Sequence, residues 1–410
     1  MSDRGVGKDR FPASAPAPAG TVRVPPDAPS RAHAIAATLR AAAPQIEAAR
    51  ALTSGVVTAL HDARMFRLVL PRSISGDEVD LVTLARTLET LACADASSAW
   101  CVGQAAGCAI AAAYLAPEVA QRLFGPADAV LAWGAGIAGR MTAVDGGYKV
   151  TGKWLFASGC ANATLLGGHC YVFERDGSQR RRADGRPLDR TALFVKAKAT
   201  IHDDWSTLGL RGTASYTYEV TDLFVPDDET IDREDPAERR EDGALFVFPT
   251  TQIHATVFSA LMIGVAQGMV GELTALAMTK TPRGASSSMK DSPMFQGQLA
   301  VLEARLRACR AYLHTTLEQA FHQAGETPAL SIEQLANLKL ASTWVINQGV
   351  EIATEAYRAA GAHAIFQSAP FEQRMRDCLS ASQQVQGRPS NFVTIGRVLM
   401  GLPPDTALLG

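Results

Sequence analysis

The hydrophobic pattern of the first third of the chain predicts helices. Between residues 31 and 68, apolar side chains recur every three or four positions among good helix formers, and Pro44 is expected to kink or divide the segment. Three further helical segments follow, namely LVTLARTLETLACAD, SSAWCVGQAAGCAIAAAYLA and PEVAQRLFG, the last opening with Pro117. We therefore expect an N-terminal α-helical domain over residues 31–128. Residues 1–30 are rich in Pro, Ala and Gly and are predicted to be a disordered leader.

The pattern changes near residue 129, where short β-prone runs begin to alternate with Gly and Asp turns. The tripeptide Asp145-Gly146-Gly147, set between alternating residues, is a strong hairpin signal. We expect a small antiparallel β-barrel over residues 129–235. The strongly charged loop 174–190 has two interpretations, a solvated loop or a docking patch for a phosphate-bearing substrate.

From residue 245 onward the pattern is helical again. Three long apolar or amphipathic segments are predicted, and the third opens with a capping box formed by Ser331 and Gln334. The stretch from Arg374 to Arg397 supplies a fourth helix. Four helices joined by short links predict a four-helix bundle over residues 245–410, and hence an α+β fold that is mostly α.

Composition narrows the possible functions. The net charge of -2 favours neither nucleic acid nor an anionic membrane, and because no run of about 18 apolar residues is unbroken, we expect no membrane span. The seven cysteines lack CxxC spacing, which is typical of reduced thiols in the cytoplasm, and no Cys/His cluster has the spacing of metal ligands. The chain also lacks a Rossmann fingerprint, a P-loop, GxSxG and HExxH, so any cofactor must be bound by another type of fold.

The order of several motifs resembles the acyl-CoA dehydrogenase superfamily over nearly the whole chain after residue 30. The matching segments are LPRSISGDEVDL, ADASSAW, DGGYKVTGKWLFASGCANA, LGLRGTASYTYEVTDLFVP, FQGQLAVLEARL and AAGAHAIFQSAPFEQRMRD. The resemblance implies the same three-part fold. FASGC, LRGTAS and the C-terminal RD…GR are similar to one branch, the two-component flavin-dependent monooxygenases. Enzymes of that branch take reduced flavin from a separate reductase and use oxygen to oxidise small organic molecules.

The resemblance also implies residues around a flavin. Ser158 in FASGC matches a serine that approaches flavin N5, and Phe156 is expected to pack near the isoalloxazine ring. Arg211, Thr213 and Ser215 match the second β-motif beside the flavin, although the branch usually has Gly between the last two, where this chain has Ala. The structural alternatives are a turn serine that bonds its own backbone for Ser158 and an ion pair for Arg211.

Two more flavin contacts are implied across a subunit interface. Gln296 in FQGQLA matches a glutamine that helps to hold the flavin there, and Arg283 is expected to serve a flavin phosphate through its planar fork of donors. Such shared sites imply a homotetramer, with a dimer as the alternative.

Two reactions compete for this site, and they need different residues. A dehydrogenase needs a carboxylate base near the substrate α-carbon, and the place matching that base is Val385. His254 matches an alternative position for the base, near the start of the first bundle helix. The phenol hydroxylases of the branch commonly have a His where this chain has Gln384, which can hydrogen-bond but cannot take a proton. His254 and then His363 remain the candidate bases, and a histidine without a catalytic role is the alternative for each.

The absence of a carboxylate at position 385, where a dehydrogenase would have its base, favours an oxygen-dependent flavin monooxygenase. Its candidate catalytic residues are Ser158, His254 and Gln384, and its co-substrate is reduced FMN or FAD from a separate flavin reductase. The substrate is expected to be a small aromatic, amine or thioether. Two alternatives remain, an acyl-CoA dehydrogenase-type flavoenzyme with a non-standard base and a non-catalytic protein that kept the fold.

Overall fold

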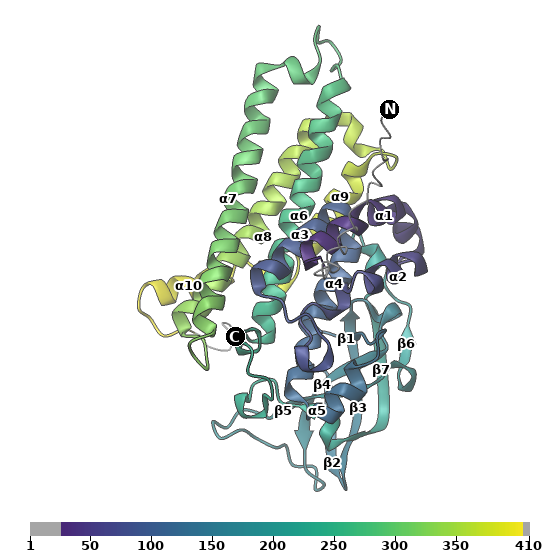
Figure 1. Ribbon diagram of the computed structural model, residues 1–410, viewed down its shortest axis with the longest axis vertical. Coiled ribbons are helices and arrows are strands. Elements are labelled where there is room, and N and C mark those ends of the chain that lie inside the picture. The colour runs from purple at the N-terminus through teal and green to yellow at the C-terminus, as the bar shows by residue number, and fades with distance from the viewer. Residues whose placement is uncertain (1–25, 405–410) are drawn as a thin grey trace, which may run out of the picture.

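The computed structural model describes residues 26–404, which form three regions (Figure 1). The N-terminal region is helical, and its α-helices are α1 (Ala28–Ala49), α2 (Ser54–Asp62), α3 (Leu81–Ala94), α4 (Ala96–Ala109) and α5 (Pro117–Phe124). Helix α1 begins before residue 31 because Asp27 caps it, accepting a hydrogen bond of 2.9 Å from Ser30 N. Pro44 lies inside α1 and does not divide it. Residues 1–25 of the predicted leader lie outside the described residues.

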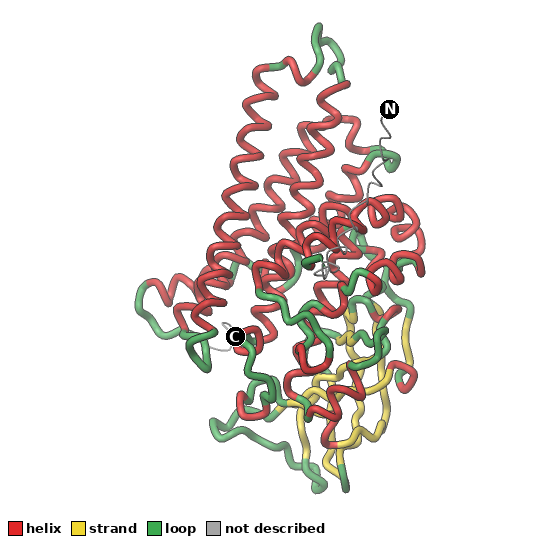
Figure 2. The backbone as a smooth tube through the Cα atoms, viewed as in Figure 1, coloured by secondary structure: helices red, strands yellow, loops and turns green. Residues whose placement is uncertain are grey.

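The middle region is one eight-stranded sheet, seen as the yellow segment of Figure 2. Its strands are β1 (Leu131–Trp133), β2 (Gly139–Val144), β3 (Gly147–Ala157), β4 (Leu165–Phe173), β5 (Asp189–Val195), β6 (Thr200–His202), β7 (Tyr216–Pro226) and β8 (Thr230–Ile231). They follow the order β6-β7-β3-β2-β4-β5-β8, with β1 beside β4. The hairpin predicted at Asp145-Gly146 joins β2 to β3, with Gly146 at a φ of 75°.

The sheet differs from the prediction in one respect, because two of its strand pairs are parallel. Strand β4 pairs parallel with β2 and with β1, whereas the other pairs are antiparallel. The reason is topological. Strand β4 begins at the end of the sheet where β3 stops, so it runs in the same direction as β2, its neighbour.

The C-terminal region is the predicted bundle, formed by α6 (Thr250–Thr279), α7 (Pro293–Ala324), α8 (Ile332–Ala360) and the shorter α9 (Pro370–Ala381), followed by α10 (Asn391–Leu399). The capping box of Ser331 and Gln334 is present at the start of α8. Helix α6 is long and apolar enough to cross a membrane, but 94% of its most apolar window is buried inside the protein, where it is the central helix of the bundle.

The stretch from Arg374 to Arg397, predicted to be one helix, contains parts of two helices. Helix α9 ends at Ala381, a short 3₁₀ turn covers Val385–Gly387, and α10 starts at Asn391. The backbone is extended at Gln384 and again at Arg388, and Pro389 accounts for the second of these because proline disfavours the helical conformation of the residue before it. Residues 382–390, which a continuous helix would have included, therefore form a loop with one 3₁₀ turn.

The β region is joined tightly to the bundle through the loop before β7. A Cβ atom at Gly209 would lie 2.1 Å from the carbonyl oxygen of Arg376 on α9, so only glycine permits this approach. Leu210 N donates a 2.6 Å hydrogen bond to the buried carboxyl group of Asp377. Burial raises the pKa of Asp377 to about 7. This junction fixes the segment after α9 against the sheet and forms one side of a cavity.

Candidate active site

A cavity of about 860 Å³ lies where the three regions meet. Helix α4, the ends of several strands, the first turns of α6 and the segment after α9 all contribute to it. The three predicted catalytic residues, Ser158, His254 and Gln384, line this one cavity although they are far apart in the sequence. Among the described residues that line it, none is Asp or Glu, and two are arginines, Arg233 and Arg388.

A directed chain of hydrogen bonds fixes the hydroxyl of Ser158. Thr213 Oγ1 donates to the carbonyl of Leu210 at 2.8 Å, so its single proton is used there, and Ser215 must donate to Thr213 at 2.7 Å. By the same reasoning Ser158 donates to Ser215 at 2.7 Å. Trp100 Nε1, which can only donate, binds Ser158 Oγ at 2.8 Å. Ser158 therefore has no proton left for the cavity and offers it one acceptor lone pair.

The backbone around these hydrogen-bonded hydroxyl groups is strained. Phe156, Leu210 and Ala214 have φ values of 64°, 51° and 43°, in the left-handed region that non-glycine residues rarely adopt. Such strain costs about 1–3 kcal/mol for each residue and is concentrated at functional sites. Phe156 is 57% exposed and meets Trp205 edge-on, with ring centroids 6.1 Å apart. An exposed aromatic held in a strained conformation provides a flat apolar face on which a planar ligand can lie.

A row of rings continues along the cavity. Trp100 stacks on Phe258 with centroids 4.4 Å apart, and Phe258 stacks on His254 at 5.8 Å. Trp133 lies 6.5 Å from His254 and meets His169 edge-on at 4.9 Å. All five side chains line the cavity. Helical spacing produces part of this row, because positions 254 and 258 lie on the same face of α6.

His254 is neutral in this environment. Its Nδ1 lies 3.0 Å from the Thr250 carbonyl oxygen, which can only accept, so Nδ1 carries the proton and Nε2 is the acceptor. Burial, together with the nearby charge of Arg233 and opposed by this hydrogen bond, lowers the pKa of His254 to about 4. The ring has room only because Gly107 lacks a side chain, since a Cβ there would lie 2.3 Å from Nε2. His254 is therefore a weak base and a fixed hydrogen-bond acceptor.

Two polar groups of the cavity have no partner in the described part of the chain. Both amide atoms of Gln384 are buried without a hydrogen bond, and Arg233 makes neither a hydrogen bond nor an ion pair with residues 26–404. The Arg233 guanidinium lies 5.5 Å from the centroid of the Trp133 ring. Burial lowers its pKa. An unsatisfied buried polar group costs about 1–3 kcal/mol, so the Gln384 amide favours binding of a polar ligand, and the Arg233 guanidinium has free donors for one.

The remaining predicted residues are distributed differently. Phe156 and Ser215 line the cavity, and Thr213 lies behind it, where it orients Ser215. Arg211 forms a 3.5 Å ion pair with Glu47 and does not line the cavity, which is the arrangement given as its structural alternative.

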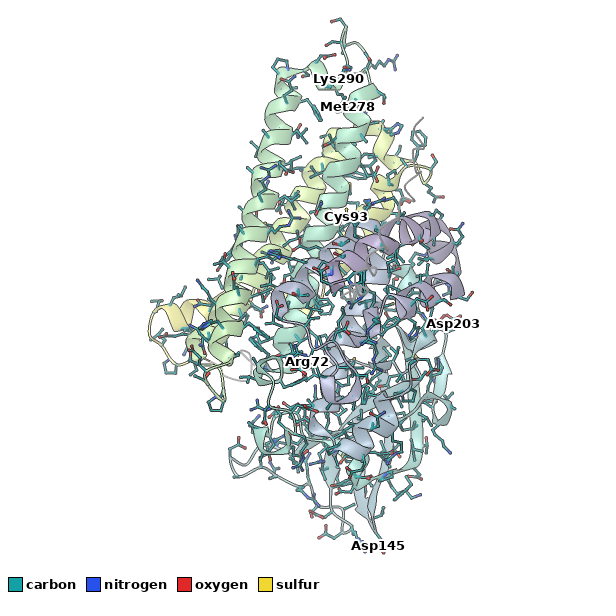
Figure 3. The ribbon with its side chains drawn as sticks, in the orientation of Figure 1. Arg72, Cys93, Asp145, Asp203, Met278 and Lys290 are labelled. Atoms are coloured by element: carbon teal, nitrogen blue, oxygen red, sulfur yellow. The ribbon has the colours of Figure 1, made fainter. Side chains whose placement is uncertain are left out.

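Arg283, Gln296 and His363 lie elsewhere. The loop that carries Arg283 is at the tip of the bundle marked by Met278 and Lys290 in Figure 3, and Gln296 Nε2 donates to Lys290 O. Helix α6 has 30 residues and spans about 45 Å between the cavity and this tip, so neither residue reaches the cavity of its own chain. Their role across a subunit contact stays a prediction. His363 is exposed beyond the end of α8, in the part of the chain next to Lys280, and does not line this cavity.

Several cavity residues were not identified from the sequence. They are Trp100, Gln104, Trp133, His169 and Arg233. Trp100 belongs to ADASSAW, which indicated the fold, but its bond to Ser158 depends on tertiary structure. The other four residues belong to no recognised motif, and they come together only when the sheet packs on α4 and α6.

The arginines of the charged loop 174–190 are engaged within the protein. Arg180 pairs with Glu174 at 2.6 Å, Arg182 with Asp232 at 2.8 Å, and Arg190 with Glu238 at 2.6 Å. Arg186 pairs with Asp184 at 2.8 Å. These pairs favour the interpretation as a structural loop over a phosphate-docking patch.

Known proteins resemble the chain in sequence and in fold. Residues 256–385 match the model of the acyl-CoA dehydrogenase C-terminal domain. An indole-3-acetate monooxygenase of Pseudomonas putida is 25% identical over 89% of this chain and 91% of its own length. An FADH(2)-dependent resorcinol hydroxylase, oxygenase component, of Rhizobium sp. (strain MTP-10005) is 25% identical over 91% and 94%.

The solved structures agree. The crystal structure of 3-HSA hydroxylase from Rhodococcus sp. RHA1 has a TM-score of 0.85 at 22% identity and covers 94% of this chain and 99% of its own. The predicted fold and the predicted resemblance to flavin-dependent monooxygenases of the acyl-CoA dehydrogenase superfamily are confirmed.

Proposed function

We propose that this chain, which has the acyl-CoA dehydrogenase fold and resembles the two-component flavin monooxygenases, is an oxygenase component that uses reduced FMN or FAD and dioxygen to oxidise a small aromatic molecule. The relatives named above are a monooxygenase and a hydroxylase of aromatic compounds, and one of them is described as FADH(2)-dependent. A separate reductase that supplies the reduced flavin is part of the proposal.

The absence of a carboxylate from the described cavity lining carries the choice of reaction. Removal of an α-proton by a dehydrogenase needs a base of suitable strength within hydrogen-bond reach of the substrate. Asp377 is engaged by Leu210 N and does not line the cavity. His254, the alternative base, has a pKa of about 4, too low for this purpose. The cavity therefore disfavours the dehydrogenase alternative.

The cavity residues fit a reduced flavin. Reduced flavin carries an N5–H donor, and Ser158 offers an acceptor that cannot act as a donor. Phe156 and Trp205 provide apolar surface for a planar ring, and the unpaired Gln384 amide can donate to and accept from polar atoms of the ring edge. We infer that these residues hold the flavin.

When bound, reduced flavin supplies the two electrons that let dioxygen transfer one atom to the substrate and release the other as water. The residues of this chain bind, orient and exclude water. The aromatic row surrounds the substrate with apolar surface, and neutral His254 presents Nε2 as an acceptor for a substrate O–H or N–H. Gln384 cannot take a proton, so substrates that need no deprotonation at that position are favoured.

The assembly and location belong to the same proposal. A homotetramer would bring Arg283 and Gln296 of one chain to the flavin of another, which the distance along α6 makes impossible within a single chain. The seven cysteines form no disulfide among the described residues, in keeping with a cytoplasmic protein.

A single-turnover experiment tests the proposal. The protein is mixed anaerobically with chemically reduced FMN or FAD and one of a panel of aromatic compounds, and is then exposed to ¹⁸O₂. The masses of the products are measured by mass spectrometry. We expect at least one compound to gain a single ¹⁸O atom, with close to one product formed per flavin oxidised.

Conversion of all reduced flavin to hydrogen peroxide with every compound would contradict the proposal. Anaerobic bleaching of bound FAD by acyl-CoA thioesters would instead support the dehydrogenase alternative. Failure to retain either redox form of the flavin would support the non-catalytic one.

A further inference from the structure

Arg233 differs from the arginines of the neighbouring charged loop, which are engaged within the protein. It is the second residue after β8, and its neighbour Asp232 is turned toward Arg182, which binds both carboxylate oxygens at 2.8 and 2.9 Å. Asp189 is also taken by Arg182, at 3.3 Å. The nearest carboxylates are thus engaged, while Arg233 itself lines the cavity without a hydrogen bond or an ion pair to residues 26–404.

The surroundings of Arg233 favour an anion. The cavity has no acidic residue among its described lining, so the carboxylates that act on Arg233, those of Asp189, Glu234 and Asp232, lie outside the cavity. Thr250 and Thr251, the first residues of α6, also line the cavity, and α6 has no side-chain cap at this end. The partial positive charge of a helix N-terminus adds to that of the guanidinium. Because Arg233 is partly buried and none of its N–H groups has a hydrogen-bond acceptor among residues 26–404, we expect an anionic partner within the cavity.

The neighbouring side chains define what the anion is attached to. The face of Trp133 lies under the guanidinium, which leaves the edge of its planar fork available for a bidentate partner. Trp133, His254 and Phe258 provide flat apolar surface next to it. A carboxylate on a short tether from an aromatic ring satisfies both features.

We propose that Arg233 binds the carboxylate of an aromatic acid substrate and thereby selects acids over their neutral analogues. The inference rests on the proposed function, since it names the substrate class of that site. Arg388, which also lines the cavity but is exposed, is assigned no such role.

Binding of an isosteric pair tests this inference without turnover. 1-Naphthaleneacetate and 1-naphthaleneacetamide have the same ring and nearly the same shape, and differ in charge. Their affinities are measured by calorimetry with the wild-type protein, Arg233→Met, Arg233→Gln, Arg233→Lys and the control Arg388→Met. We expect the wild type to prefer the acid by about tenfold or more, as a charge-assisted bidentate pair allows. Arg233→Met and Arg233→Gln should lose about 10- to 100-fold in affinity for the acid and less than about threefold for the amide.

Arg233→Lys should recover part of the preference, because lysine keeps the charge but lacks the fork. Arg388→Met should keep all of it. Because the acid-to-amide ratio is internal to each variant, a variant with altered stability still gives a readable result.

Three outcomes would overturn the inference: no preference for the acid in the wild type, equal loss of acid and amide in Arg233→Met, or loss of FMN affinity in that variant with riboflavin affinity kept. The last would assign Arg233 to the flavin phosphate. In all three cases ¹⁸O transfer to a neutral aromatic compound would still stand as evidence for the monooxygenase, so the two proposals fail separately.

Discussion

The two walls of the cavity differ in how their polar groups are satisfied. On the Ser158 wall, each hydroxyl proton has an assigned acceptor, and the chain from Trp100 to the Leu210 carbonyl runs in one direction. On the second wall, at the far end of the row of rings that begins at Trp100, Arg233 has no hydrogen-bond partner within residues 26–404, and His254 leaves Nε2 unoccupied.

The difference separates two kinds of ligand. A wall on which every hydroxyl proton is already used can accept a hydrogen bond but cannot donate one. It therefore favours the redox state of a cofactor that carries a donor over the state that carries an acceptor. A wall with an unpaired cation and an open acceptor beside stacked rings gains the most from a partner of complementary charge, which suits a substrate. The following changes should affect one wall and leave the other intact.

The largest effect is expected from Gly107→Ala. The new Cβ would lie 2.3 Å from His254 Nε2, so the ring must leave its present position. We expect a loss of about 1–3 kcal/mol in the free energy of unfolding, measured with urea, together with weaker binding of aromatic ligands and unchanged flavin affinity.

Gly271→Ala on α6 is the matched control, because nothing lies within 4 Å of the added methyl group. It should stabilise the protein by about 0.5–1 kcal/mol, since alanine favours the helix. If Gly107→Ala were as stable as Gly271→Ala, the proposed packing of His254 would be wrong.

A second prediction concerns the pH dependence of stability. The pKa of His254 is about 4 in the folded protein and about 6.5 when unfolded, so between these values the unfolded state binds more protons. Stability therefore rises with pH across this window and is lost as the pH falls. His254→Asn keeps a donor for the Thr250 carbonyl and removes the titrating ring. Between pH 7.5 and pH 5 the wild type should lose about 2 kcal/mol more than this variant.

Urea unfolding at both pH values measures this difference, and the exposed His363→Asn serves as the control that should behave like the wild type. Parallel pH profiles for the wild type and His254→Asn would show that the ring is not held neutral.

A smaller effect is expected on the other wall. Ser158→Ala removes the acceptor that the directed chain presents to the cavity, and reduced-flavin affinity should fall about tenfold, the value of one hydrogen bond. Affinity for an aromatic acid should not change. Ser342→Ala, a buried serine inside the bundle, should leave both affinities unaltered. Loss of acid binding in Ser158→Ala would mean that the two walls are not separate.

The sequence was sufficient for the fold and for part of the site. Ser158, His254 and Gln384 could be selected because each occupies a motif position, and all three line the cavity. Their chemical roles stay predictions. Local signals were less reliable where tertiary contacts decide. Helix α4 begins within the segment ADASSAW at its N-cap Asp95, whose carboxylate accepts from Ser98 N at 2.7 Å, and Pro44, expected to kink or divide the first helix, is accommodated inside α1.

The features that distinguish the two walls could not be read from the sequence. The direction of the Ser158 chain depends on which carbonyl Thr213 reaches, and the unpaired state of Arg233 depends on Arg182 taking both neighbouring carboxylates. Each of these features depends on three or more residues that meet only in the folded protein, so the spacing of residues along the sequence does not predict it.

The central claim is that the Ser158 wall accepts a hydrogen bond from reduced flavin and offers none to the oxidised form. Its most direct test is an anaerobic titration that compares the dissociation constants of reduced and oxidised FMN for the wild type and Ser215→Ala. We predict that the wild type binds reduced FMN about tenfold more tightly, and that the ratio falls several-fold in Ser215→Ala, where the freed Ser158 proton can be donated to oxidised flavin. Equal affinity for the two forms in the wild type, or an unchanged ratio in Ser215→Ala, would contradict the account.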